Sequence, residues 1–172
     1  ILLISFIALS SAGQMAQWRG PDRNGVYPDT GLLKSWPEEG PQLFLKIEGI
    51  GRGFSSAVAT DERIYVTGLK DSLDMLMAYD FQGELIWERP FGRAWNKSVP
   101  DSRCTPTIDN NRTYVLSGLD NLVCFNAENG DQIWSVDIHK EYGSNWDMFG
   151  VSESVLLVDD KVICTPGGDI TT

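Results

Sequence analysis

Short apolar runs separated by polar turns are the main pattern of this chain. In one typical stretch, runs rich in Val, Ile, Tyr, Thr and Leu cover residues 103–108, 113–117, 122–126 and 132–137, with Asp, Asn and Gly between them. Runs of this length and composition predict β-strands joined by tight turns. After the first dozen residues, no stretch keeps the apolar spacing of an amphipathic helix. We therefore expect an all-β protein with little helix.

The pattern of strands and turns repeats along the chain. The sequence MAYDFQGELIW at residues 77–87 aligns with CFNAENGDQIW at residues 124–134. The alignment places Gly83 over Gly130 and Trp87 over Trp134, each pair 47 residues apart. Self-similarity at a fixed period indicates stacked supersecondary units.

A turn that begins with aspartate precedes each copy. Asp61, Asp109 and Asp159 open these turns, and Asp159 begins a third copy. Four antiparallel strands that recur every ~40–50 residues are typical of a β-propeller blade. A β-sandwich is the alternative, but it does not explain why glycine and tryptophan recur together. The sequence predicts a partial β-propeller of about three four-stranded antiparallel blades.

The repeated glycines and tryptophans have architectural roles in this interpretation. Gly83 and Gly130 supply the positive φ of the turn before the last strand of a blade. Trp87 and Trp134 lie on that last strand, where a flat ring with one N–H donor packs against the neighbouring blade. We therefore treat these four residues as structural repeat positions rather than ligand contacts.

Residues 78–87 and 125–134 resemble the tryptophan-docking repeat of the pyrroloquinoline quinone (PQQ)-like propellers. That superfamily holds the quinoprotein alcohol dehydrogenases and the BamB-type outer-membrane assembly factors. The opening WRGPDRNG at residues 18–25 is similar to the start of many exported members. The resemblance implies a monomeric ring of about eight blades, of which this chain holds the N-terminal part. An earlier partial copy has Phe44 or Leu45 in the tryptophan position, and residues 43–47 would complete the last blade of such a ring.

The first residues resemble a targeting signal. Residues 1–12 (ILLISFIALSSA) are uncharged and almost wholly apolar, and they are shorter than the ~20 residues that span a bilayer. Ser10 and Ala12 form a small-x-small cleavage pattern, and Ala16 offers a second one. We expect residues 1–17 to be the remnant of a signal peptide and residues 18–172 to be propeller. The protein would then be periplasmic or secreted, with no stable membrane insertion.

Composition excludes two classes of partner. The chain has 172 residues, a net charge of −10 and a pI near 4.4. Because nucleic-acid binding rests on clustered Lys and Arg, we do not expect a nucleic-acid partner. Cys104, Cys124 and Cys164 form no CxxC pair, and His139 is the single histidine, so zinc binding is not expected. The cysteines are either small buried hydrophobes or include one disulfide.

Three further features have competing interpretations. The glycines of residues 49–53 suggest a phosphate loop, but no helix follows them, so a flexible loop leading into the first blade is favoured. Residues 126–131 carry oxygen ligands near Gly130, either as a calcium site or as a plain turn. His139 lies near no nucleophile motif, and we expect it in a solvent-facing loop.

The resemblance also bears on cofactors. For members that bind PQQ it implies an adjacent pair of cysteines, a stacking tryptophan and a carboxylate-bound calcium, and no two cysteines are adjacent here. We therefore expect no cofactor and a non-catalytic exported scaffold that binds a protein or a glycan. The alternative is a PQQ- and calcium-dependent oxidoreductase of the alcohol or sugar dehydrogenase type.

One set of positions is a candidate binding site. Counting back six residues from the three turn aspartates reaches Ser55, Arg103 and Glu153. The resemblance places these positions on the innermost strands, at one mouth of the central channel. A repeat position that varies between Ser, Arg and Glu suits asymmetric binding, whereas core positions in repeats stay alike. The alternative is an ion pair between Arg103 and Glu153 on adjacent blades.

Overall fold

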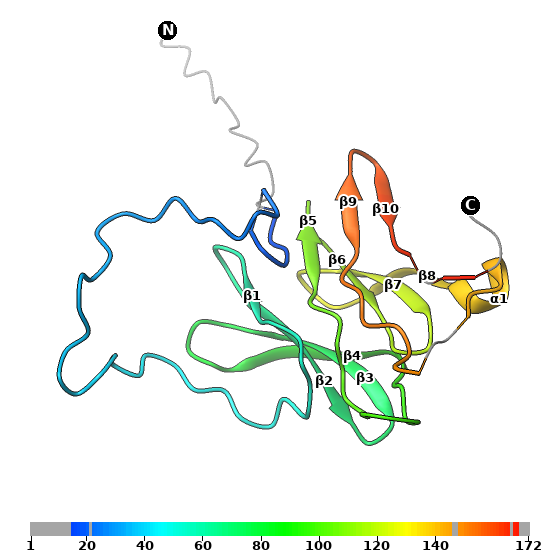
Figure 1. The fold of residues 1–172 in the computed structure, drawn as a ribbon, viewed down its shortest axis with the longest axis horizontal. Coiled ribbons are helices and arrows are strands. Elements are labelled where there is room, and N and C mark those ends of the chain that lie inside the picture. The colour runs from blue at the N-terminus through cyan, green and yellow to red at the C-terminus, as the bar shows by residue number, and fades with distance from the viewer. Residues whose placement is uncertain (1–14, 21, 146–147, 166, 169–172) are drawn as a thin grey trace, which may run out of the picture.

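The computed structural model describes residues 15–20, 22–145, 148–165 and 167–168. These residues form two four-stranded antiparallel sheets and a two-stranded hairpin, which follow one another along the chain (Figure 1). The first sheet contains β1 (Val58–Ala59), β2 (Ile64–Lys70), β3 (Leu73–Tyr79) and β4 (Leu85–Arg93). The second contains β5 (Thr107–Asp109), β6 (Arg112–Leu116), β7 (Asn121–Asn126) and β8 (Gln132–Asp137). The short helix α1 (Ile138–Tyr142) precedes the hairpin of β9 (Leu156–Val158) and β10 (Lys161–Ile163).

The expected all-β architecture of propeller blades is confirmed. In both sheets the strands pair in chain order, as they do in a blade that runs from an innermost to an outermost strand. The third copy contributes only β9 and β10 among the described residues. β5 is shorter than the predicted strand at 103–108, because Thr105 donates its N–H to Ser154 Oγ of the next unit, 2.9 Å away, and not to β6.

The two sheets share one hydrophobic core. Leu76 of β3, Phe91 of β4 and Val115, Val123 and Phe125 of the second sheet belong to one buried cluster. Burying a side chain of this kind stabilises the fold by about 1.5–3 kcal/mol. The cluster also includes Val155 and Leu157, so the hairpin packs on the second sheet as the second sheet packs on the first.

The turn before the last strand is built in a similar way in both sheets, although the second turn is one residue longer. Asp80 Oδ1 accepts hydrogen bonds from the N–H groups of Gln82 and Glu84, and Asn126 Oδ1 accepts from those of Glu128 and Asn129. Gly83 and Gly130 follow with φ of 87° and 72°, as predicted. Residues 126–131 therefore form a turn, and the Asn126 side-chain oxygen accepts hydrogen bonds within it.

The glycines of residues 49–53 do not form the flexible loop that we expected. Arg52 pairs with Leu69 of β2 through two backbone hydrogen bonds of 3.3 and 2.7 Å. A Cβ on Gly51 would lie 2.3 Å from the carbonyl oxygen of Leu69, and one on Gly68 would lie 2.1 Å from that of Ile50. These glycines are needed because two backbones approach closely there.

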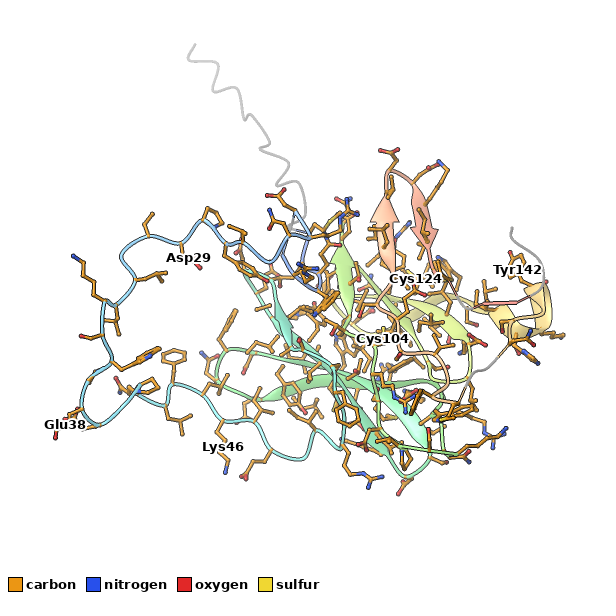
Figure 2. All side chains as sticks on the ribbon, viewed as in Figure 1. Asp29, Glu38, Lys46, Cys104, Cys124 and Tyr142 are labelled. Carbon is orange, nitrogen blue, oxygen red and sulfur yellow. The ribbon has the colours of Figure 1, made fainter. Side chains whose placement is uncertain are left out.

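A long segment outside any strand precedes the first sheet. Residues 26–50 loop away from the sheets, and Asp29, Glu38 and Lys46 are spread along this loop (Figure 2). The segment returns at Leu45, whose Cδ1 would lie 3.0 Å from a Cβ on Gly83. Phe44 is exposed. Leu45 therefore contacts Gly83 in the way that a repeat tryptophan contacts the repeat glycine of the following blade.

The three cysteines are free thiols. Cys124 lies in β7 and Cys104 in the segment before β5 (Figure 2). Both are buried, and Cys164 is half-buried. Burial raises the pKa of Cys104 to about 12 and that of Cys124 to about 11. Of the two interpretations of the cysteines, the small buried hydrophobe holds. His139 lies in α1 rather than in a loop, with its Nδ1 2.7 Å from the carbonyl oxygen of Ser144.

The proposed signal region at residues 1–12 lies outside the described residues. Ala16 and Gln17 are described, and both are buried against the second sheet. Ala16 and Gln17 thus pack with the described part of the fold, while the boundary expected between residues 17 and 18 stays a prediction. Within the described part of the chain, no helix is long and apolar enough to cross a membrane.

Candidate functional site

The sheet register shows which positions are equivalent in the three units. Val58 pairs with Tyr65, Thr107 with Tyr114, and Leu156 with Ile163. The units are therefore offset by 49 residues both times, and the residue equivalent to Ser55 and Glu153 is Cys104, not Arg103. Counting back from the aspartates gave the wrong residue in the second unit, because Asn110, rather than Asp109, is equivalent to Asp61 and Asp159.

The three predicted mouth residues have separate partners. Ser55 Oγ donates to the carbonyl oxygen of Thr67 at 3.2 Å. Glu153 Oε2 accepts from the N–H of Thr165 at 2.6 Å. The Arg103 guanidinium donates to the carbonyl oxygens of Val99 and Phe149. Among the described residues, the ion pair between Arg103 and Glu153 is not formed.

Arg103 joins two connecting loops. Val99 lies in the loop between β4 and β5, and Phe149 lies between α1 and β9. A second link runs from Ser98 Oγ to the carbonyl oxygen of Met148 at 2.9 Å, and Trp95 Nε1 donates to the same hydroxyl at 2.7 Å. Both loops lead into innermost strands, so they meet at the end of the sheets where those strands start (Figure 1). The structure thus places Arg103 at the end where we expected a channel mouth.

Apolar side chains are exposed at this end. They are large hydrophobic side chains of the two loops and of the segment before β1, and we call them the mouth patch. Its four members are Phe54 (66% exposed), Val99 (44%), Met148 (67%) and Phe149 (53%). Phe54 is held there by its N–H, which donates to the carbonyl oxygen of Ser102 at 2.8 Å. Arg52, which pairs with Asp101 at 3.1 Å, adds an exposed cation. The arrangement is an apolar surface with a charged rim on hydrogen-bonded loops.

A row of hydroxyl groups connects the innermost strands, and the sequence analysis missed it. Ser56 donates its N–H to Thr105 Oγ1 at 3.0 Å, and Thr105 donates its own to Ser154 Oγ at 2.9 Å. The three hydroxyl residues recur every 49 residues. That spacing was a usable signal, but Ser and Thr are too common to stand out beside glycine and tryptophan.

Two buried aspartates also hold neighbouring units together behind the mouth. Asp74 Oδ2 accepts from the N–H of Gly118 at 2.9 Å, and the equivalent Asp120 Oδ2 accepts from Ser144 Oγ at 2.5 Å. Desolvation raises the pKa of Asp74, while the Gly118 N–H, the Ser102 hydroxyl and the charge of Arg103 act against it. Asp74 is therefore a structural carboxylate beneath the mouth, closed off from solvent.

The repeat tryptophan of the first sheet docks on the second, as predicted. Trp87 Nε1, Tyr65 OH and Arg63 Nη1 donate to the carbonyl oxygen of Ala127 at 3.1, 3.0 and 2.9 Å. A Cβ on Gly130 would lie 2.7 Å from Trp87 Cδ2, so the indole packs on the bare glycine backbone. These contacts are structural, and they exclude Trp87 from a ligand site.

On the second sheet, the residues equivalent to Arg63, Tyr65 and Trp87 are Arg112, Tyr114 and Trp134, and the first two lie beside a cavity. Trp134 is half-buried and contacts Tyr114, with ring centroids 6.0 Å apart. A cavity of about 370 Å³ lies beside Arg112 and Tyr114, between the turn after β5 and the turn after β9. On the first sheet, the same position relative to Arg63 and Tyr65 is filled by Ala127 and its turn. The cavity therefore lies at the position where, on the first sheet, the following unit docks.

Metal-ligating side chains do not gather in the part of the chain that the structure describes. There, no three His, Cys, Asp or Glu side chains come close enough to hold a metal ion.

Comparison with known proteins agrees with the blade geometry. The family described as outer membrane protein assembly factor BamB matches residues 13–172. No curated protein matches the chain. A europium-containing methanol dehydrogenase is 15% identical, with a TM-score of 0.51 over 68% of this chain and 21% of that one. A quinohemoprotein alcohol dehydrogenase, ADHIIG of Pseudomonas putida HK5, is 18% identical with a TM-score of 0.46 over 69% of this chain and 17% of that one.

These likenesses differ in what they establish. At 15% identity, the methanol dehydrogenase shares the fold alone, and this chain spans about a fifth of its length. The family match covers nearly the whole chain, including both tryptophan-docking repeats and the mouth loops. The chain belongs to the PQQ-like β-propeller repeat family described as outer membrane protein assembly factor BamB.

Proposed function

We propose that this chain supplies the binding face of a non-catalytic, exported β-propeller that docks a protein partner at the mouth patch. The observation that carries the proposal is the set of exposed hydrophobics Phe54, Val99, Met148 and Phe149, presented on loops that Arg103 and Ser98 tie together. Apolar side chains grouped on an otherwise acidic protein mark an interaction surface. Loops held by side-chain hydrogen bonds lose less conformational entropy on binding than free loops do.

A protein is favoured over a glycan by the chemistry of the patch. Val99 and Met148 are aliphatic, and methionine adapts its shape to different apolar partners. A glycan site needs several side-chain donors and acceptors directed outward, whereas the Arg103 guanidinium and the Ser98 hydroxyl are already bonded to carbonyl oxygens. The family description also names an assembly factor, and assembly depends on contacts between proteins.

The apolar run at residues 1–12 supports export, which makes the proposed compartment periplasmic or extracellular. Blades of this length fit a ring of about eight, and the matched methanol dehydrogenase is itself several times longer than this chain, which covers 21% of it. The partner would then contact the ring at one end of its axis. A quinone-dependent dehydrogenase is the competing function, and no feature of the described residues favours it.

The experiment is site-specific photo-crosslinking in cells that express the full-length protein. A photoreactive amino acid replaces Phe149 in the mouth patch or, as a control, Leu33 of the loop before β1, which is exposed to a greater extent (69% against 53%). We expect a discrete protein adduct from position 149 and none from position 33. Equal adducts at both positions would refute the proposal, and so would dye-linked alcohol oxidation by purified protein supplied with PQQ and calcium.

A further inference from the structure

The motif WRGPDRNG at residues 18–25 has no role in the function proposed above, yet it is tied to the innermost strands. We propose that residues 16–20 and 22–25 form a clasp that joins the innermost strands of two blades and closes the end of the ring axis opposite the mouth patch. The inference goes beyond the proposed function and does not depend on it.

The first tie is a backbone pair with β5. Ala16 donates its N–H to the carbonyl oxygen of Ile108 at 2.9 Å, and Ile108 donates its own to Ala16 at 2.7 Å. β5 is paired with β6 along its other edge, so Ala16 occupies the edge that faces the axis. A free edge of this kind is a site of unwanted strand pairing, and the clasp covers it. Ala16 joins the hydrophobic core and Gln17 is buried beside it.

The second tie reaches the next unit. Arg23 Nη1 donates to the carbonyl oxygen of Leu157 in β9 at 3.1 Å. Ile108 and Leu157 both lie in innermost strands, near the ends where those strands finish. Figure 1 shows the dark blue segment beside that end of β5, away from the loops of the mouth. One short stretch of chain thus bonds to two adjacent blades on the axial side.

The clasp is held in shape by its own residues. Gly20 and Gly25 donate their N–H groups to Gln17 and Arg19 at 3.1 and 3.0 Å, and Arg23 donates its N–H to Gly20 at 3.0 Å. Gly20 and Gly25 have φ of 79° and 73°, which glycine adopts without strain. These local bonds restrict the backbone that carries the Arg23 side chain toward β9. This explains why glycine and arginine recur within so short a motif.

Charge favours the same placement. Asp109 ends β5, and the turns that follow β1 and β9 carry Asp61, Asp159 and Asp160. The clasp brings Arg19 and Arg23 to this acidic end of a chain whose net charge is −10. Opposite charges at partly exposed positions favour association modestly. With the clasp in place, a partner reaches the axis from the side of the mouth patch.

The test is amide hydrogen exchange on the folded chain and its variants. Arg23→Ala removes the bond to Leu157. Arg19→Ala is the matched control, because it removes the same charge from the same motif, and the Arg19 guanidinium bonds within the clasp, to the carbonyl oxygen of Asn24. Arg23→Lys restores a donor of similar reach. Amides of Val115 and Val123, in the core strands β6 and β7, report whether each variant is folded.

We expect the Ala16 and Ile108 amides to exchange at least 100-fold more slowly than those of Leu32 and Leu33 in the exposed loop. Arg23→Ala should speed exchange at Ala16, Ile108 and the β9–β10 hairpin at least tenfold, Arg23→Lys less, and Arg19→Ala less than threefold. The proposal fails if Ala16 and Ile108 exchange as fast as the exposed loop in the parent, or if Arg23→Ala leaves the hairpin unchanged while Val115 and Val123 stay protected. If Arg23→Ala unfolds the chain, Arg23→Lys and the parent still decide the question.

Discussion

The indole ring of Trp87 lies directly on the backbone of Gly130, on the neighbouring sheet. Its N–H reaches the carbonyl oxygen of Ala127 at 3.1 Å, and a Cβ on Gly130 would be 2.7 Å from the ring. Leu45 has the corresponding relation to Gly83. The repeat of glycine and tryptophan is thus one contact made between successive blades, in which each blade supplies a ring and a bare turn.

Replacing Trp87 with alanine should lower the free energy of unfolding by about 3–5 kcal/mol, because it opens a cavity between the sheets and removes one donor to Ala127. Trp134→Ala is the comparison, since that ring is half-buried and should cost about 1–2 kcal/mol here. Urea denaturation measures both. A loss of less than 1 kcal/mol for Trp87→Ala would show that the ring is not the docking element.

Gly130→Ala should cost more than its backbone conformation alone explains. Gly143 has a similar φ, 67° against 72°, but a Cβ there would meet nothing within 4 Å. Gly143→Ala therefore measures the strain of a positive φ, about 1 kcal/mol, and Gly130→Ala adds the clash with Trp87, about 1–3 kcal/mol more. Equal losses of stability in the two variants would contradict the contact.

The raised pKa of Asp74 makes its contribution to stability depend on pH. Burial favours the protonated carboxyl in the folded state, so the folded pKa lies above the unfolded value of 3.8. The contribution is fully present below pH 3.8 and is lost as the pH rises through the folded pKa. Asp74→Asn removes this titration. The unfolding free energy of the parent minus that of Asp74→Asn should therefore fall between pH 4 and pH 7, and a difference that rises would show that the sign is wrong.

Thiol reactivity should separate the cysteines. The pKa values of Cys104 and Cys124 are raised to about 12 and 11 by burial, so neither forms thiolate near pH 8. Cys164 is half-buried and should react first with an aromatic disulfide reagent. We expect one accessible thiol in native buffer, none in Cys164→Ser, and three after unfolding of the parent. Rapid reaction of two thiols in the folded parent would refute this arrangement.

The sequence was sufficient for the blades because their contacts repeat. Gly83, Gly130, Trp87 and Trp134 stand out, since each blade needs the same ring and the same bare turn. Arg103 was chosen one residue out of register, because Asp109 is chemically identical to Asp61 while Asn110 is its structural equivalent. That this end of the sheets forms a channel mouth stays a prediction.

Other features depend on contacts that no local pattern encodes. Ala16 pairs with Ile108, which is 92 residues away, and Arg23 reaches Leu157 across 134 residues. The mouth patch arises where two loops and the segment before β1 meet. Val99 and Met148 share the 49-residue spacing of the units, but Phe54 and Phe149 do not, and no motif marks the four together. We expected residues 49–53 to form a flexible loop, because glycine permits motion. In this structure their glycines instead allow the backbone to approach that of β2 closely.

Arg103→Ala, assayed for thermal unfolding and for photo-crosslinking from position 149 in the same full-length protein, tests the central claim most directly. The claim is that Arg103 holds the loops of Val99 and Phe149 in a shape that a protein partner recognises. The account predicts a strong loss of the crosslinked adduct with little change in the unfolding temperature. A lowered unfolding temperature with an unchanged adduct would contradict it and would leave Arg103 as a structural residue alone.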